Sequence, residues 1–367
     1  MKFSVTRNVL IKPVQAITGI VDKRNTMAIL GNIKLEAHDG VLSLAATDLE
    51  VEVIAKIPVA VEVPGSITVP GKKLLDICRS LPDEASLAFT VDGSQAVLTS
   101  GRSRFTLAVL SADDFPSIES KLEDAPVQVV QSVLSRLLKR SYFAMASQDV
   151  RYFLNGLLVE MSDTYLRTVA TNGHRLAMTT SNMAIPLSGA KRQVIVPRKA
   201  VMELMRLLDD SDEVVDVTLG AGHIRVTLPH YQFTSKLIDG RYPDYNRVIP
   251  TENKNIVKVN RELLKQTLSR TAILSNEKYH GIRVNMASNL MTLSANNPEQ
   301  EEAKDELDVE YTGAEMEIGF NVNYLIDALS VMEQEHVVIV LNGASGSAVL
   351  RDGPDSDSVY VVMPIRL

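Results

Sequence analysis

The sequence predicts an α+β protein built from three copies of one unit, each with two helices on antiparallel sheets. Two groups of residues each occur three times with a spacing of about 125 residues. ATNGH at 170–174 corresponds to ATDLE at 46–50 and ANNPE at 295–299. VPRKAVMELMRLL, VPGKKLLDICRSL and FNVNYLIDALSVM form the second group. A period this long indicates a repeated domain and not the short unit of a solenoid.

Length and composition agree with three domains. A chain of 367 residues with 45% hydrophobic and 23% charged residues is ordinary for a globular protein of two to four domains. We predict domains over 1–120, 127–248 and 254–367, with charged or polar linkers at 119–126 and 251–255. The N-terminal segment is a poor signal peptide, and no apolar run approaches the ~20 residues of a membrane span. The single cysteine, Cys78, excludes an internal disulfide and fits a reducing cytoplasm.

The first unit opens with the strand MKFSV and a helix that begins near Thr6, which Pro13 is expected to kink or confine. Strands IKLEAHD, VLSLAATD and LEVEVIAKI follow, with Asp39-Gly40 as the turn between the first two. SITVP leads into a helix over 71–81, whose apolar residues recur at helical spacing. Strands SLAFTVD, QAVLTSG and SRFTLAVL complete the unit.

The second and third units repeat this order. Helices are predicted over 131–146 and 197–208 in the second unit, and over 260–271 and 321–332 in the third. The segments between them alternate apolar and polar residues, as antiparallel strands do. Each unit therefore has two helices and about seven or eight strands.

Charge is sorted between the helices and the rest of the chain. The six helical segments, counting the first as 7–24, carry +11 in a chain of net charge −7, so the remainder carries −18. Basic helices in an acidic protein indicate one surface that attracts polyanions and another that repels them. For any single one of these cations a solvated surface charge is the simpler interpretation, so the prediction depends on the whole set. The set comprises Arg7, Lys12, Arg136, Lys139, Arg140, Arg198, Lys199, Arg261, Lys265 and Arg270.

Several longer motifs occur in order along the whole chain: TDLEVEV (47–53), GRSRFTL (101–107), QDVRYFLNG (148–156), ATNGHRLA (170–177), VIVPRK (194–199), FTSKLIDGRYPDY (233–245), RTAILSNEKYHGIR (270–283), ANNPEQEEA (295–303) and the ending YVVMPIRL. With them the chain resembles the bacterial DNA sliding clamps, the beta subunits of DNA polymerase III. Members of that family fold each unit as two helices on curved antiparallel sheets. Two chains close head to tail into a ring, which DNA threads.

The resemblance implies a non-catalytic processivity factor that holds enzymes on DNA. The implied partners are duplex DNA of any sequence, the catalytic subunit of DNA polymerase III, the clamp loader, other polymerases and repair proteins with clamp-binding peptides, and a second copy of the chain. A cytoplasmic location is expected, with no cofactor and no metal. Contact with phosphates and not with bases suits a ring that slides.

By resemblance, two loops contact DNA more closely than the helices do. One loop contains Arg24, and the other contains Gln148, Tyr152 and Phe153. The two aromatic side chains are expected to stack on bases of a single strand.

The resemblance also implies a pocket for short linear peptides between the second and third domains. An apolar groove with a few polar anchors suits that ligand, and methionine adapts to varied partners. This sequence has Asn172 where the family commonly has Asp, and Ile365 where it commonly has Met, so peptide preference is expected to differ. Val359 and Val361 are expected to be partly buried in a terminal strand. The pocket positions are Leu154, Thr171, Gly173, His174, Arg175, Leu176, Pro243, Arg247, Val248, Asn321, Tyr324, Ser347, Val361, Met363, Pro364, Ile365 and Arg366.

Ring closure requires two different surfaces that meet head to tail. The resemblance pairs a basic edge of the first domain with an acidic edge of the third. Without it, the acidic run that also includes Asp305 and Glu306 would be interpreted as a solvated face. The interface positions are Lys73, Arg102, Arg104, Phe105 and Leu107 on one side, and Ile273, Leu274, Glu299, Glu301 and Glu302 on the other.

Two other functions remain open from the residues. A DNA-processing enzyme is disfavoured because the six histidines form no zinc motif and no P-loop occurs. His174 with Asn172 and Ser181 could suggest a triad, but a loop histidine is the simpler interpretation. Metal-dependent nuclease activity would favour the enzyme. A scaffold that does not bind DNA would tolerate charge reversal at Lys139 and Arg140.

Overall fold

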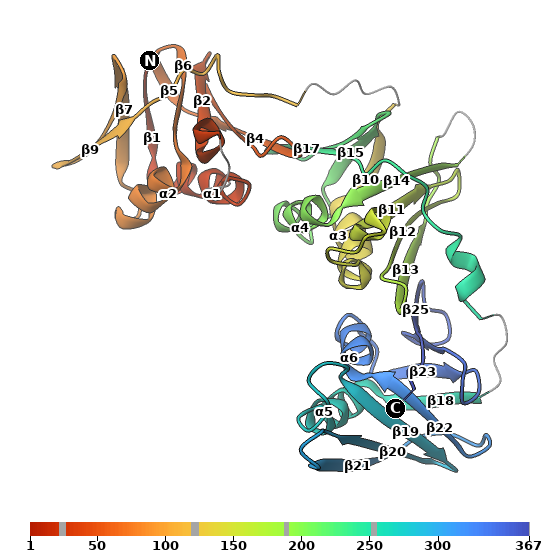
Figure 1. Cartoon of the computed structure of the whole chain (residues 1–367). Helices are drawn as coiled ribbons and strands as arrows, with labels where there is room; N and C mark the ends of the chain where they lie inside the picture. Colours follow the sequence, from red (N-terminus) through yellow and green to blue (C-terminus); the bar gives the residue numbers. More distant parts are fainter. Residues whose placement is uncertain (22–26, 119–124, 187–190, 251–254, 367) are drawn as a thin grey trace. The chain divides into compact units, whose positions relative to one another are not determined.

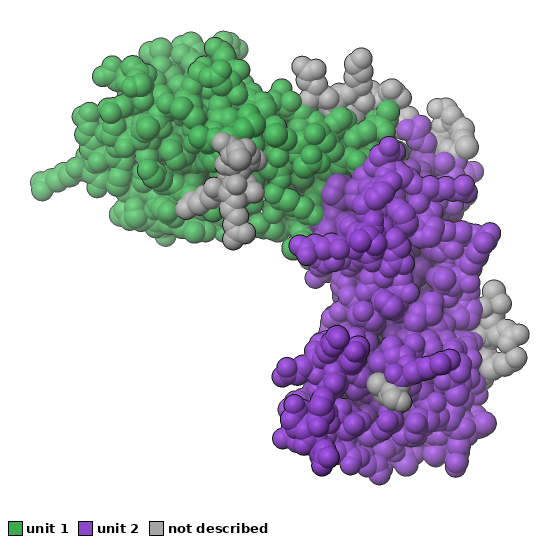
Figure 2. Space-filling view, in the orientation of Figure 1, with its two compact units in different colours: residues 1–135, 199–237 green, residues 136–198, 238–367 purple. Residues whose placement is uncertain are grey.

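The computed structural model describes residues 1–21, 27–118, 125–186, 191–250 and 255–366. The chain separates into two compact units, whose bounds differ from those of the three sequence repeats. Unit 1 comprises residues 1–135 and 199–237, and unit 2 comprises residues 136–198 and 238–367; Figure 2 colours them green and purple. Most of the two predicted linkers and Arg24 lie outside the described residues. No described helix is long and apolar enough to cross a membrane.

Unit 1 contains two antiparallel sheets, of strand order β5-β1-β7-β8-β9 and β10-β15-β16-β17-β4-β3-β2-β6. Helices α1 (Arg7–Thr18) and α2 (Gly71–Ser80) lie side by side in Figure 1. The strands are β1 (Lys2–Thr6), β2 (Asn32–His38), β3 (Val41–Thr47), β4 (Val51–Pro58), β5 (Ala60–Val63), β6 (Gly65–Pro70), β7 (Ser86–Asp92), β8 (Gln95–Ser100), β9 (Ser103–Ala108), β10 (Val127–Val130), β15 (Val214–Leu219), β16 (His223–Thr227) and β17 (Tyr231–Lys236).

Unit 2 contains an eight-stranded sheet of order β14-β11-β12-β13-β25-β24-β23-β18 and a four-stranded sheet of order β21-β20-β19-β22. Its complete helices are α5 (Arg261–Ala272) and α6 (Val322–Ser330); α3 (Gln131–Lys139) and α4 (Arg198–Leu207) each cross the division between the units. The strands are β11 (Gly156–Met161), β12 (Tyr165–Thr171), β13 (Arg175–Asn182), β14 (Arg192–Pro197), β18 (Asn255–Asn260), β19 (Gly281–Ala287), β20 (Leu290–Asn296), β21 (Glu302–Asp308), β22 (Met316–Asn321), β23 (His336–Leu341), β24 (Ala348–Arg351) and β25 (Ser358–Val362).

These elements confirm the predicted α+β fold, with two α-helices in each third of the described chain. The helices are amphipathic: α1 buries Leu10, Val14 and Ile17 against the sheet, whereas Lys12 is exposed. The predicted turn at Asp39-Gly40 has φ of 47° and 76°, as a two-residue hairpin turn with positive φ requires.

Three local expectations are corrected. The helix predicted over 131–146 ends at Lys139, because the Ser141 hydroxyl donates to the Leu137 carbonyl and competes with the helical hydrogen bonds. The first helix ends at Thr18, and Pro13 lies inside it without confining its start. Strand β5 was not predicted from the sequence.

Both eight-stranded sheets join strands of different repeats. In unit 1 the last strand of the second repeat, β17, pairs antiparallel with β4 of the first, with Phe233 opposite Val53. In unit 2 the last strand of the third repeat, β25, pairs antiparallel with β13 of the second, with Ala177 opposite Tyr360. By the same repeat order, β9 and β21 are the remaining members of this set, and each is the edge strand of its sheet within the described chain.

Candidate functional site

Unit 2 has a mostly apolar groove with a cavity volume of about 260 Å³. Its walls come from the 3-10 helices η3 (Tyr152–Asn155) and η4 (Tyr245–Val248), the turn from β12 to β13, and the segment after β25. Leu154 and Leu176 belong to the buried core beneath it, together with Val361, which is fully buried. The lining residues are Arg151, Phe153, Leu154, Thr171, Gly173, Arg175, Leu176, Pro243, Asp244, Tyr245, Val248 and Met363.

The turn at 171–175 is held by its own side chains. The Thr171 hydroxyl accepts from the Gly173 amide at 3.0 Å, and the Asn172 side-chain oxygen accepts from the amides of His174 and Arg175 at 3.0 and 3.1 Å. Gly173 has φ of +87°, and a Cβ there would lie 3.0 Å from the Arg151 guanidinium. Both the backbone conformation and the space therefore favour glycine.

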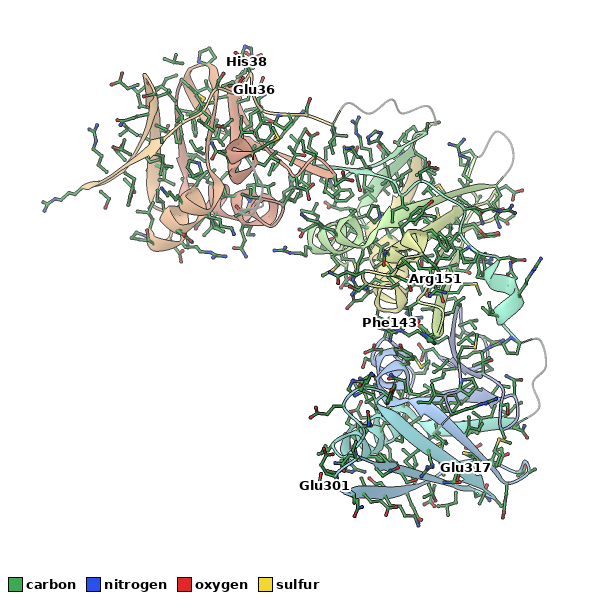
Figure 3. The ribbon with its side chains drawn as sticks, viewed as in Figure 1. Glu36, His38, Phe143, Arg151, Glu301 and Glu317 are labelled. Atoms are coloured by element: carbon green, nitrogen blue, oxygen red, sulfur yellow. The ribbon has the colours of Figure 1, made fainter. Side chains whose placement is uncertain are left out.

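Arg151 is held at the rim of the groove by a two-point ion pair with Asp149, with Nε–Oδ1 3.0 Å and Nη2–Oδ2 2.8 Å. The side-chain hydrogen bond from Arg151 lowers the pKa of Asp149 to about 2. The pair therefore stays ionised throughout the neutral range. Arg151, which is labelled in Figure 3, also donates to the Asn172 carbonyl. This hydrogen bond links the loop before η3 to the turn at 171–175.

A buried carboxylate supports η4 from below. Glu160, on β11, is 0% exposed and accepts the Tyr245 hydroxyl at 3.0 and 3.1 Å. Burial raises its pKa, but hydrogen bonds from Lys191, Tyr165 and other groups together hold that pKa below the ordinary value. An ionised Glu160 therefore fixes Tyr245, one wall of the groove.

Arg175 connects the groove to α6. Its guanidinium lies 4.5 Å from the Tyr324 ring centroid and 5.3 Å from that of Phe143, and it pairs with Asp327. Its side chain is only 11% exposed. Arg175 therefore contributes its apolar stem to the groove while its charge is used within the fold.

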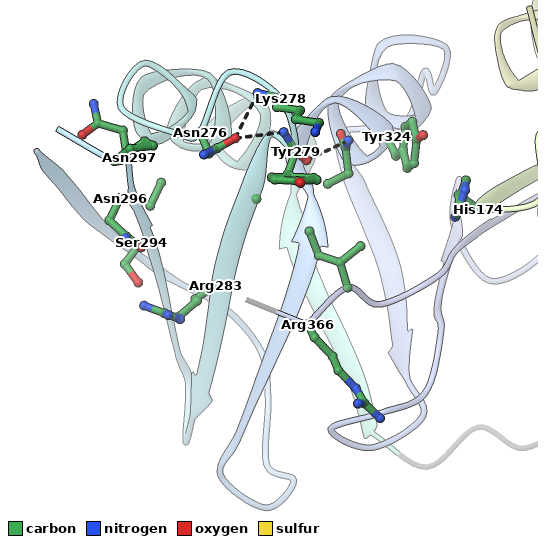
Figure 4. Close-up of a pocket in the computed structure, with 15 residues that line it drawn as sticks. His174, Asn276, Lys278, Tyr279, Arg283, Ser294, Asn296, Asn297, Tyr324 and Arg366 are labelled. Atoms are coloured by element: carbon green, nitrogen blue, oxygen red, sulfur yellow. Dashed lines mark hydrogen bonds between the residues drawn. The ribbon is translucent and has the colours of Figure 1, made fainter. Parts of the chain in front are cut away.

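A second, more polar depression, which we call the basin, adjoins the groove and has a volume of about 610 Å³. In Figure 4, His174 and Tyr324 lie at one end and Ser294 and Asn297 toward the other. The Met363 amide donates to the His174 carbonyl at 2.9 Å, so the two segments shared by groove and basin are joined directly. The basin is lined by His174, Asn276, Lys278, Tyr279, Gly281, Arg283, Ser294, Ala295, Asn296, Asn297, Pro298, Asn321, Tyr324, Ile365 and Arg366.

The predicted pocket residues divide between these two depressions. Leu154, Thr171, Gly173, Arg175, Leu176, Pro243, Val248 and Met363 line the groove, whereas His174, Asn321, Tyr324, Ile365 and Arg366 line the basin. Four predicted residues line neither. Val361 is buried in the core, Arg247 pairs with Asp244 at 3.1 Å, and Ser347 and Pro364 lie outside both linings.

Three residues that line the groove, Arg151, Asp244 and Tyr245, were not predicted as site residues. Arg151 stands within the motif QDVRYFLNG, and Asp244 and Tyr245 end the motif FTSKLIDGRYPDY, so proximity to those motifs was the available signal.

The loop before η3 presents a separate surface. Asn155 holds it by two hydrogen bonds to the backbone of Asp149, each 2.9 Å, while Val150 is 96% and Tyr152 58% exposed. Gln148 has φ of 58° and is exposed. Phe153 is different, because it is half-buried against the core and lines the groove. Phe153 keeps partial exposure, so its stacking on a base stays a prediction.

The helix cations are not equivalent. Arg140 is corrected from a surface residue to a buried one: its side chain is 8% exposed and pairs with Glu333, Asp352 and Asp357 at 2.8, 3.5 and 3.0 Å. Arg136 pairs with Asp357 at 2.6 Å but stays 39% exposed. The remaining cations keep partial exposure. Lys199 pairs with Asp48, Arg198 donates to the Met145 carbonyl, and Lys12 and Arg270 are exposed.

Some of the predicted interface residues lie on the edge strands β9 and β21, and the others lie on α2, after α5 and in the loop before β21. On β9 and the turn before it, Arg102 and Arg104 are exposed, Phe105 is half-buried and Leu107 is buried. Lys73 is exposed on α2. At the other edge, Ile273 is 75% exposed after α5, Leu274 is half-buried, and Glu299, Glu301 and Glu302 are exposed at β21. The described residues contain no cluster of His, Cys, Asp and Glu with the geometry of a metal site.

Comparison with known proteins places the whole chain in one family. Three family models match in order: the N-terminal domain of the DNA polymerase III beta subunit at 1–119, its central domain at 128–244 and its C-terminal domain at 246–366. The chain belongs to this family, the beta sliding clamps. Such clamps are non-catalytic DNA polymerase processivity factors.

Individual clamps agree over the full length. The chain is 48% identical to the beta sliding clamp of Pseudomonas putida and 46% identical to that of Escherichia coli K12, with 100% of both chains covered in each case. A crystal structure of the sliding clamp of Pseudomonas aeruginosa bound to griselimycin superposes with a TM-score of 0.97 at 47% identity, again covering 100% of both chains.

Proposed function

We propose that two copies of this chain close head to tail into a ring around duplex DNA. The ring tethers the DNA polymerase III catalytic subunit, other polymerases and repair proteins through peptides bound in the groove. A clamp loader opens and closes the ring, and the protein acts on chromosomal DNA in the cytoplasm. The clamp from Pseudomonas aeruginosa that binds griselimycin supports a ligand-binding role for a clamp of this kind.

The observation that carries the proposal is the pair of edge strands left by the repeat. Two junctions within the chain follow one rule: the last strand of a repeat pairs with a strand of the repeat before it. These junctions are β17 with β4 and β25 with β13. Only β9 and β21 remain for a third junction of this kind in the described chain. Unpaired edges invite pairing with another chain. Arg104 on β9 and Glu302 and Glu306 on β21 give the two edges opposite charge.

Such a junction is heterologous, and it forms a closed dimer when the rotation between copies closes after two steps. Ile273, exposed beside the acidic edge, would be buried by it. The exposed lysines and arginines of the helices would then neutralise phosphates without base contacts. The proposed DNA contacts are Arg136, Lys139, Arg198 and Lys199, with Gln148 and Tyr152 from the loop before η3.

The decisive experiment is retention on nicked circular DNA at high salt, after loading by a clamp loader with ATP. We expect the protein to survive salt on circles and to leave when the circle is cut once. Ile273→Asp should abolish retention by preventing ring closure. Ile256→Asp, at a residue 51% exposed on the edge strand β18, is the matched control and should be retained. Loss of the wild-type protein from uncut circles in salt would contradict the ring.

A further inference from the structure

We propose that the basin binds the acidic flank of a peptide whose apolar part occupies the groove. This inference rests on the proposed function of the groove, and it assigns the chemistry of the flanking residues that the protein prefers. The inference depends on two cations of the basin, Lys278 and Arg283, for which the sequence predicted no role.

The basin is positively charged in an acidic protein. Its lining includes Lys278, Arg283 and Arg366, together with His174, and contains no Asp or Glu. The chain as a whole has 45 acidic and 38 basic residues, so a lining with three cations and no carboxylate departs from the average. A concave site with one sign of charge concentrates ligands of the opposite sign.

These cations are weakly neutralised by the fold. Lys278 Nζ lies 5.2 Å from the Tyr279 ring centroid, and neither Lys278 nor Arg366 forms an ion pair with a described carboxylate. Arg283 Nε is 3.9 Å from Glu317 Oε1, and both side chains are about half exposed, so this contact is at the limit of an ion pair. Charge therefore remains available to a ligand at each position.

The turn that carries Lys278 is ordered before any ligand binds. The Asn276 side-chain oxygen accepts the amides of Lys278 and Tyr279 at 3.0 and 3.1 Å, and Asn321 donates to the Tyr279 carbonyl at 3.1 Å (Figure 4). Because the Asn276 oxygen is occupied, its amide nitrogen is left as a donor. A preorganised donor loses less conformational entropy when a carboxylate binds.

The basin continues the groove along the same two chain segments. In one segment Gly173 lines the groove and His174 lines the basin. In the other segment Met363 lines the groove and Ile365 lines the basin. The Ile365 amide donates to the Gly319 carbonyl at 2.8 Å, and this bond fixes the chain segment from Met363 to Ile365. A single extended peptide can therefore reach both depressions.

A peptide fits the basin better than a DNA backbone does. Glu301 accepts the Asn297 side chain at 2.6 Å, which places a carboxylate beside one rim of the basin. That carboxylate would repel a continuous row of phosphates that crosses this rim, whereas a short acidic segment need not extend to it. Gln148 and Tyr152, the loop residues proposed to contact DNA, do not line the basin.

The test uses synthetic fluorescent peptides with a Leu-Phe pair for the groove and a flank of either Asp-Glu-Asp or Asn-Gln-Asn. The flank is placed on the N-terminal side in one pair of peptides and on the C-terminal side in the other. Affinity for the full-length protein is measured by anisotropy at low and high salt. In one of the two pairs we expect the peptide with the acidic flank to bind about fivefold more tightly than its neutral counterpart at low salt, as two exposed ion pairs allow. At high salt we expect little difference between the two peptides.

Variants separate the basin from the groove. Lys278→Ala with Arg283→Ala should remove the advantage of the acidic flank and leave the neutral peptide within twofold. Lys258→Ala with Lys236→Ala is the matched control: these side chains are 47% and 44% exposed and line neither depression, so the advantage should persist. Glu317→Gln should increase the advantage about twofold, because it frees Arg283.

The outcomes are distinguishable from failure of the proposed function. If the wild-type protein binds no peptide, the groove itself is misassigned. Equal affinity for acidic and neutral flanks, or an advantage that survives Lys278→Ala with Arg283→Ala, overturns only the inference about the basin. Loss of duplex DNA binding in that double variant, with no preference for acidic flanks, would assign the basin to DNA instead.

Discussion

Among the described residues, each unit buries one glutamate on an interior strand of its eight-stranded sheet, and the two behave in opposite ways. Glu52 of unit 1 is 5% exposed, and burial raises its pKa even though the Ile118 amide and the charges of Arg225 and Lys34 oppose the shift. Glu160 of unit 2 is 0% exposed, yet its pKa is lowered. Burial alone therefore does not decide whether a carboxylate stabilises a fold.

The difference lies in the partners. Glu160 accepts from Tyr165 at 2.7 Å and Gln193 at 2.6 Å, and it pairs with Lys191 at 2.7 Å, in addition to the Tyr245 hydroxyl. Glu52 accepts the Ile118 amide at 3.2 Å, a longer bond from a neutral donor. A buried charge stabilises the folded state where short, charge-assisted bonds replace the water that it loses.

The largest expected effect is at Glu160. Glu160→Ala should destabilise unit 2 by about 3 kcal/mol at pH 7, because it leaves buried donors and two cations without their acceptor. Since the folded pKa is lowered, the contribution of Glu160 is present above the ordinary value of about 4.5 and is lost as pH falls through the folded value. Urea unfolding at pH 7 and at acid pH measures both.

The control for Glu160 is Glu310→Ala, at a residue 72% exposed that pairs with Lys258, and it should cost less than about 0.5 kcal/mol. A loss at Glu160→Ala no larger than this control would contradict the role assigned to the buried carboxylate.

A smaller effect is expected when one partner is removed. Tyr245→Phe deletes a hydroxyl that bonds to Glu160 but keeps the ring that lines the groove. We expect a stability loss of about 1.5 kcal/mol, as for a hydrogen bond to a charged group, and peptide affinity within twofold. A larger loss of affinity with unchanged stability would show that the hydroxyl acts on the ligand directly.

The smallest effect on stability is expected at Glu52, where a substitution should stabilise the fold instead of destabilising it. Its raised pKa means that the contribution of Glu52 is most favourable below the ordinary value of about 4.5 and is lost as pH rises through the folded value. Glu52→Gln should therefore stabilise unit 1 at pH 7 by on the order of 0.5 kcal/mol, and the gain should disappear at acid pH. A loss of stability at pH 7 would place Glu52 in the same class as Glu160.

The repeat and the residue periodicity were sufficient to predict the fold class and most helices. Periodicity extended the helix α3 to residue 146, because it takes no account of the hydrogen bond from the Ser141 hydroxyl to the Leu137 carbonyl. Local pattern also could not predict the burial of Arg140, because its carboxylate partners Asp352 and Asp357 are more than 200 residues away in sequence. The sharing of sheets between repeats was also beyond local pattern, since β17 and β4 carry no signal that they pair with each other.

The candidate site was predicted from the resemblance at the level of segments. It assigned Val361 to the pocket surface, whereas this side chain is fully buried in the core beneath the groove. Val359 and Val361 were expected to be partly buried in a terminal strand, and this is confirmed. Lys278 and Arg283 stand in the motif RTAILSNEKYHGIR, but no role was predicted for them, and only folding brings them to the wall of one depression.

The pairing of strands from neighbouring repeats limits how such a chain can evolve. A copy gained by duplication supplies an edge to its neighbour and takes one in return, as β25 does for β13. Deleting one copy would strip a partner from another and leave a bare edge prone to aggregation. Selection can therefore diversify the three copies freely on their surfaces, but it can hardly remove one.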